Sequence, residues 1–146
     1  MDKINFQKKI CEVIRKRPRI FALDQDNKAN VEMIEDVEKY YDVKLPESYK
    51  DFVSEYGGGY FGFIVVYSCD YNGIFYIKEN VQKEWVLEKA FLPVIDLETG
   101  DLLGFEIING MCESVVTMYL HEENKMQKLK MDFYDVLLKY GVKYDE

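Results

Sequence analysis

The chain has 146 residues, of which 48% are hydrophobic and 15% aromatic, too apolar for a disordered protein and of the length of one domain spanning residues 1–146. Residues 1–50 carry 11 basic and 10 acidic side chains, whereas residues 51–146 carry 8 and 17, so the net charge of −8 belongs to the last two thirds. Such a surface repels nucleic acid and anionic membranes and attracts basic partners, which predicts a protein that binds neither nucleic acid nor membrane directly.

The first third of the chain predicts three helices, over residues 4–16, over residues 31–42 and from Pro46 to Tyr56. Pro18 ends the first, Asn30 is placed to cap the second, and Gly57 supplies the stop of the third. Their apolar residues recur at the spacing of one helical face, which predicts that these faces pack into the core. The predicted faces are Ile4, Ile10, Val13 and Ile14; Val31, Ile34, Val37 and Tyr41; and Leu45, Tyr49, Phe52, Val53 and Tyr56.

The rest of the chain predicts mainly strands. Asn72-Gly73 lies between two apolar runs, residues 63–67 and 74–77, and so indicates a hairpin. A short helix over residues 79–89 follows. Further strands are predicted over residues 91–95, 102–108 and 114–120, with Pro93 at an edge or an entry point, and a closing helix over residues 131–140. Helices, then hairpin-like strands, then a last helix indicate an α+β fold with a mainly antiparallel sheet.

The cysteines and the amino-terminal residues indicate a cytoplasmic protein. Cys11, Cys69 and Cys112 are odd in number and lack CxxC spacing, which argues against a disulfide framework or a zinc site and predicts buried or half-buried thiols. The segment from Met1 shows no apolar run of the signal-peptide kind, and the longest apolar stretch, residues 61–67, is far too short to span a bilayer.

The sequence offers no intact catalytic or cofactor motif. Residues 57–62 fit GxGxxG by letter, but a helix precedes and a strand follows them, the reverse of the dinucleotide-binding order, so the glycines are interpreted as a sharp turn. The acidic segment from Asp24 lacks the oxygen ligand at the fifth position and the glycine at the sixth position of a calcium-binding loop. His121, the only histidine, lies at a strand end without a recognisable nucleophile motif. These observations predict a protein without enzymatic activity, cofactor or metal.

Residues 34–59 resemble the signature of the SUKH superfamily, which includes yeast cell-wall regulators. The pattern there is a helix with a Glu, then Leu-Pro, a Tyr and a Phe three residues apart, and a Gly-Gly ending. The matching residues are Glu38, Leu45, Pro46, Tyr49, Phe52, Gly58 and Gly59. Weaker matches follow at residues 100–105, 115–122 and 132–138. Most of these residues have a structural explanation, so they identify the fold more securely than the activity.

The resemblance implies an immunity protein, or antitoxin, that binds and neutralises a secreted polymorphic toxin, often a nuclease. The charge asymmetry fits this independently, because an acidic surface can associate quickly with a basic nuclease domain and cover it. The alternative is a non-catalytic regulatory or scaffold domain, as in the fungal members. A third possibility is a small-molecule-binding or hydrolytic domain.

We expect the toxin to bind the acidic turns on the sheet side of the molecule, because residues 51–146 hold the excess of carboxylates. The predicted toxin-binding residues are Asp70, Asp96, Glu98, Asp101, Glu106, Glu113, Glu122 and Glu123. The second candidate surface is the aromatic segment around Tyr60 and Phe61.

Overall fold

The first three helices form where the sequence predicts them. In the computed structural model, which describes residues 1–144, they are α1 (Lys3–Lys16), α2 (Val31–Tyr41) and α3 (Glu47–Glu55). The Asp2 carboxylate caps α1 by accepting from the Asn5 amide, and the Asn30 side chain caps α2 by accepting from the Met33 amide. These caps satisfy amide groups that have no partner within the helix, which fixes where each helix begins.

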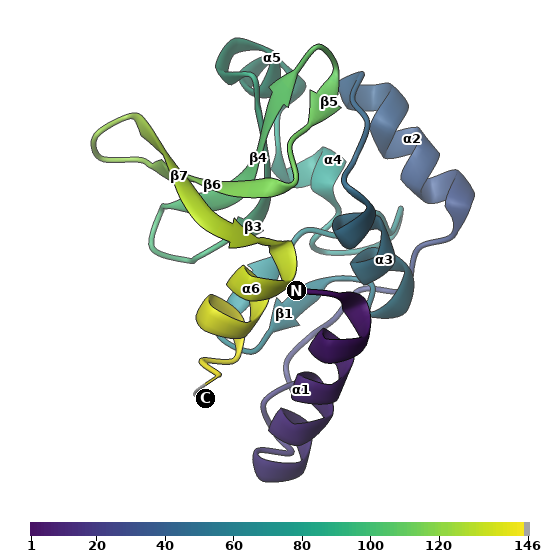
Figure 1. Cartoon of the computed structure of the whole chain (residues 1–146). Helices are drawn as coiled ribbons and strands as arrows, with labels where there is room; N and C mark the ends of the chain where they lie inside the picture. The colour runs from purple at the N-terminus through teal and green to yellow at the C-terminus, as the bar shows by residue number, and fades with distance from the viewer. Residues whose placement is uncertain (145–146) are drawn as a thin grey trace.

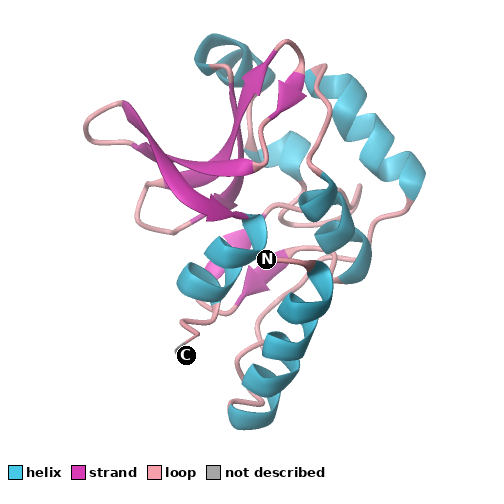
Figure 2. Cartoon of the chain, viewed as in Figure 1, coloured by secondary structure: helices cyan, strands magenta, loops and turns pink. Residues whose placement is uncertain are grey.

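An antiparallel sheet follows the helices (Figure 1). Its strands are β1 (Gly59–Phe61), β2 (Ile64–Val66), β3 (Phe91–Asp96), β4 (Leu102–Ile108), β5 (Met111–Cys112), β6 (Val115–Leu120) and β7 (Lys125–Asp132). The order is β1-β2-β3-β4-β6-β7, and β5 pairs with the end of β4. Two short helices, α4 (Ile77–Asn80) and α5 (Lys83–Lys89), precede β3, and α6 (Phe133–Val136) follows β7. The α+β class and the closing helix are confirmed (Figure 2).

Helices cover both faces of the sheet. On one face, Phe105 of β4 contacts Tyr49 of α3 and Phe133 of α6, with ring centroids 6.5 and 5.9 Å apart. Side chains alternate between the two faces along a strand, so the positions next to those that contact α3 and α6 point to the opposite face of the sheet. There Trp85 of α5 packs edge-on against Phe91 at 6.1 Å. The sheet is therefore the middle layer between α3 and α6 on one side and α5 on the other.

The predicted core of α3 is confirmed. Leu45, Tyr49, Phe52 and Val53 are all buried. The Tyr49 hydroxyl donates to the carbonyl of Tyr67 at 2.6 Å, so this buried polar group is satisfied. Burial raises the pKa of the Tyr49 hydroxyl well above its usual value, which keeps it protonated as a donor.

Glu38 of α2 holds the loop between α2 and α3. Its Oε2 accepts a hydrogen bond of 2.8 Å from the backbone amide of Leu45. We expect Glu38→Ala to lower the free energy of unfolding by about 1–2 kcal/mol, because a partly buried amide loses its partner. Urea denaturation of Glu38→Ala against Glu38→Gln, which keeps an acceptor oxygen, checks this. Equal stability of the two variants would contradict the assigned role.

The glycine run lets the chain pass close to the segment before α2. A Cβ atom on Gly59 would lie 2.8 Å from the carbonyl oxygen of Asp24, and Gly59 has φ of 96°. The Asp26 amide donates to the carbonyl of Gly58 at 2.9 Å. Only glycine combines this backbone conformation with such a close approach. The interpretation of the run as a turn between helix and sheet is thus confirmed.

The hairpin predicted at Asn72-Gly73 is wrong. Residues 74–76 form no strand, and the run continues into helix α4, so the predicted helix 79–89 is two helices. The cause is Asp26, whose carboxylate accepts from the amides of Ile74 and Phe75 at 3.1 and 3.0 Å. Amides held by a side chain are not available for a hairpin ladder.

Pro93 is not at a sheet edge, because β3 lies between β2 and β4. The register between β3 and β4 shifts between Pro93 and Ile95, and such a bulge accommodates a residue that cannot donate. The predicted closing helix begins two residues late, at Phe133, because residue 131 still belongs to β7. It continues from α6 as a π-helical segment over Leu137–Gly141.

Several apolar positions assigned to helix faces are exposed, namely Ile4, Ile14 and Val31. Phe6, which was not included, is 1% exposed and takes the inward position on α1. Cys11 is also exposed, contrary to the prediction, whereas Cys69 is buried and Cys112 half-buried.

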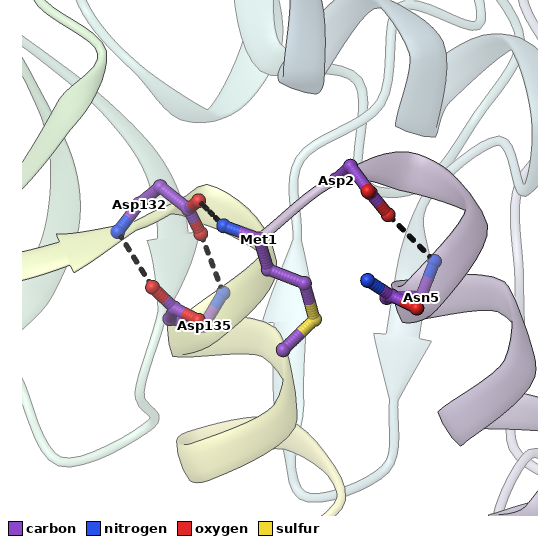
Figure 3. A network of polar contacts seen from close by, with 5 residues as sticks. All are labelled: Met1, Asp2, Asn5, Asp132 and Asp135. Carbon is purple, nitrogen blue, oxygen red and sulfur yellow. Dashed lines mark hydrogen bonds and ion pairs between the residues drawn. The ribbon is translucent and has the colours of Figure 1, made fainter.

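The starts of α1 and α6 lie beside one another (Figure 3). The Met1 ammonium group forms an ion pair with the Asp132 carboxylate. Asp132 and Asp135 cap α6 reciprocally: each carboxylate accepts from the other's amide, at 2.8 and 3.2 Å. This network joins residues 131 apart in sequence.

Candidate protein-binding surface

Two turns meet at one end of the sheet, the β3–β4 turn (residues 97–101) and the β6–β7 turn (residues 121–124). They meet because β4 pairs with both β3 and β6, and Leu102 lies opposite Tyr119 at the last position of that pairing. Both turns project from the same side of the sheet in Figure 1. The strand order thus brings together two acidic segments that lie about twenty residues apart in sequence.

Asp101 and His121 link the two turns. His121 Nδ1 lies 2.7 Å from Asp101 Oδ1, and the His121 amide donates to the same oxygen at 3.0 Å. These two hydrogen bonds hold the pKa of the Asp101 carboxyl below its usual value. A Cβ atom on Gly100 would lie 2.6 Å from the imidazole, so glycine is required for the ring to sit here.

Four further carboxylates surround this contact. The Glu98 amide donates to Asp96 Oδ1 at 2.7 Å, and the Tyr60 hydroxyl donates to Glu98 Oε1 at 2.7 Å. Glu122 and Glu123 are exposed in the β6–β7 turn. Across residues 1–144, none of these four carboxylates forms an ion pair with Lys or Arg. We name the acidic edge as Asp96, Glu98, Asp101, Glu122 and Glu123.

Glu106 and Glu113, also predicted to bind the toxin, lie elsewhere. Both face Lys128 of β7, whose Nζ is 3.9 Å from Glu106 and 3.3 Å from Glu113. Thr117 Oγ1 is 3.4 Å from Glu106. Their charge is partly compensated within the sheet, so they do not extend the acidic edge.

Asp70 is not a solvated turn residue, contrary to the prediction. It is 4% exposed, and its carboxylate accepts from the amides of Asn27 and Asn72 at 2.9 and 3.1 Å. Asp70 therefore fixes the loop before α2, and a partner at the surface does not reach it. Of the second candidate surface, Phe61 is buried, whereas Tyr60 joins the acidic edge through Glu98.

We expect His121→Ala to raise the Asp101 pKa part of the way back to its usual value, because the backbone amide of residue 121 still donates. In the parent protein, the stability from this contact is present above the usual pKa of 3.8 and is lost as the pH falls through the lowered value. Carboxyl NMR titration of both proteins checks this. An unchanged Asp101 pKa would show that the imidazole contact is not formed in solution.

A pocket that sequence reasoning missed lies beside the acidic edge. It has a volume of about 270 Å³, and its walls include Tyr67, Val81, Trp85, Pro93 and Leu102. Trp85 is the chain's only tryptophan and is half-buried on a short helix. The single tryptophan was the one signal available in the sequence, but its position over the sheet depends on the separate helix α5. A larger hollow, about 830 Å³, lies between the end of α2 and the β4–β5 turn.

Within residues 1–144, no three His, Cys, Asp or Glu side chains are grouped so as to hold a metal ion. None of the helices in that range is both long and apolar enough to cross a bilayer.

Comparison with known proteins identifies the family of the chain. No curated protein matches the chain at a significant level. The model of the SUKH_6 family, described as SMI1-KNR4 cell-wall, matches residues 31–137. This range begins with α2, ends after α6 and includes both turns of the acidic edge. Because the match covers most of the chain, the protein belongs to the SMI1-KNR4 family of the SUKH superfamily.

Proposed function

We propose that this protein is an immunity protein that binds and neutralises a basic toxin domain, of the nuclease kind, through its acidic edge. The observation that carries the proposal is the meeting of five carboxylates at one end of the sheet, four from the two turns and one, Asp96, from the end of β3, with no Lys or Arg in either turn. A nuclease domain is basic where it holds phosphate, so a surface of this sign complements it.

The geometry supports rapid association. Exposed carboxylates that lack cationic partners leave a negative field outside the protein, and such fields raise association rates. The Asp101–His121 contact and the Tyr60–Glu98 hydrogen bond hold the edge in shape, so little conformational freedom is lost when a partner binds.

The proposal includes action in the cytoplasm, as one domain, by binding alone. We propose no catalysis, metal or cofactor. The His121 side chain is paired with Asp101 and is 43% exposed. A general base in an acyl-transfer site needs a nucleophile beside it. Direct binding of nucleic acid or membrane is not part of the proposal, because the edge has the wrong sign for either.

A second candidate is a non-catalytic regulatory domain. The family's description as cell-wall is the observation that favours it. Such a domain would bind a protein of the cell's own regulation and would not protect against a toxin.

Co-expression separates the two candidates. The chain is produced in cells together with the toxin domain encoded beside its gene, and growth is compared with cells that carry the toxin domain alone. We expect restored growth and a one-to-one complex on size-exclusion chromatography. Toxicity that persists although the protein is folded and abundant would refute the immunity function.

A further inference from the structure

We infer that the pocket between α5 and the start of β4 receives one arginine or lysine side chain of the partner protein. This inference rests on the proposed function, because it names an anchor point beside the acidic edge. The occupant follows from three properties of the pocket: its walls, its unpaired hydroxyl and the carboxylate at its rim.

The walls are mostly apolar and aromatic, and Asn80 and Gln82 are their polar members. Trp85 from α5, Pro93 from β3 and Leu102 from β4 line the pocket. Trp85 is held edge-on between Phe91 and Tyr119, with ring centroids 6.1 and 5.2 Å away. A fixed aromatic wall suits the aliphatic stem of a long side chain, and an indole face attracts a cation.

Tyr67 lines the pocket and carries an unused hydrogen-bonding group. Tyr67 is 7% exposed, and across residues 1–144 its hydroxyl has no hydrogen-bond partner. No fully buried polar side-chain atom in that range lacks a partner, so this hydroxyl must keep contact with solvent. A nearly buried hydroxyl that reaches solvent beside a pocket can bond a ligand there without losing an internal hydrogen bond.

The Asp96 carboxylate beside the pocket supplies the negative charge that favours a cationic side chain. Asp96 is the cross-strand partner of Leu102, which places the two side chains about 5 Å apart on one face. Asp96 Oδ1 accepts from Glu98, whereas Oδ2 has no partner within the described chain. Burial, and second the nearby Asp96 charge, raise the pKa of Tyr67 to about 12, so the hydroxyl remains neutral. A cationic head group therefore meets a free carboxylate oxygen while its stem fills the pocket.

Trp85 makes occupancy measurable, because a chain with one tryptophan gives one indole N–H signal. The probe is the peptide acetyl-Gly-Arg-Gly-amide, and its control contains citrulline, which has the same shape without the charge. We expect the Arg peptide at millimolar concentration to shift the Trp85 indole signal and the Leu102 amide saturably. The citrulline peptide should bind about two- to fivefold more weakly, the effect of one partly exposed ion pair.

Two variants locate the contact. Asp96→Asn and Tyr67→Phe should each weaken the Arg peptide by about two- to fivefold. Tyr134→Phe is the matched control, because Tyr134 is similarly buried, at 6% exposure, and lies outside the pocket. Equal binding of both peptides, saturable shifts at other residues only, or no saturable shift would overturn the inference.

The same variants keep this inference separate from the proposed function. If the peptide binds in the pocket but the toxin domain does not bind the protein, the immunity function is refuted and the inference about the pocket is supported. If the toxin domain binds and Tyr67→Phe and Asp96→Asn leave its affinity unchanged, the inference about the pocket is refuted and the immunity function is supported.

Discussion

Replacing Phe52 by Ala should lower the free energy of unfolding by about 3–5 kcal/mol, a large effect for a single substitution. Phe52 is 1% exposed, and its ring lies between those of Tyr56, Phe61 and Phe133 at 5.1–5.6 Å. Its removal would leave a cavity where α3, β1 and α6 meet, because rings held from three elements cannot all move inward.

Urea denaturation followed by circular dichroism measures this effect. The matched control is Phe63→Ala, in the turn between β1 and β2, where the ring is 57% exposed. That substitution should cost about 0.5 kcal/mol or less. Similar denaturation midpoints for the two variants would contradict the packing of α3 against the sheet.

Reversing charge on the acidic edge should slow association with the toxin domain by about tenfold or more at low salt and weaken the salt dependence of the rate. The residues to change are Glu98, Glu122 and Glu123, each to Lys. Asp96 and Asp101 are less suitable, because each accepts a hydrogen bond from a backbone amide and its loss would disturb a turn.

The control for this triple variant carries the same change of net charge at another site. Glu32, Glu35 and Glu79 are exposed on α2 and α4, and their replacement by Lys should alter the association rate much less. Stopped-flow kinetics at several salt concentrations compares the two variants. If both slow association equally, net charge and not the acidic edge governs encounter.

The sequence predicts the helices of this fold better than its sheet, for physical reasons. α2 combines a capping Asn30 with apolar residues at helical spacing, and both signals are local. β7 was missed because it is an edge strand in which lysines alternate with half-buried residues, so its apolar signal is weak. The false hairpin arose because the Asp26 carboxylate, more than forty residues away in sequence, binds the amides of Ile74 and Phe75.

The candidate site likewise contains residues that the sequence indicates and residues that only the folded chain brings together. Charge counting indicated the acidic turns, and five of the eight predicted residues lie together at the acidic edge because β4 pairs with both β3 and β6. The burial of Asp70 was not predictable, because it depends on where the loop around Asn27 packs. The pocket was missed for a related reason: Tyr67, Trp85 and Leu102 come from three segments that only the folded chain brings together.

Hydrogen–deuterium exchange of the protein, alone and in complex with its proposed partner, a basic toxin domain, tests the central claim most directly. Binding through the acidic edge predicts slower exchange in residues 96–102 and 121–124, with little change in α1, where exposed basic residues would repel a basic partner. Slower exchange confined to α1–α3, with the two turns unaffected, would contradict the account.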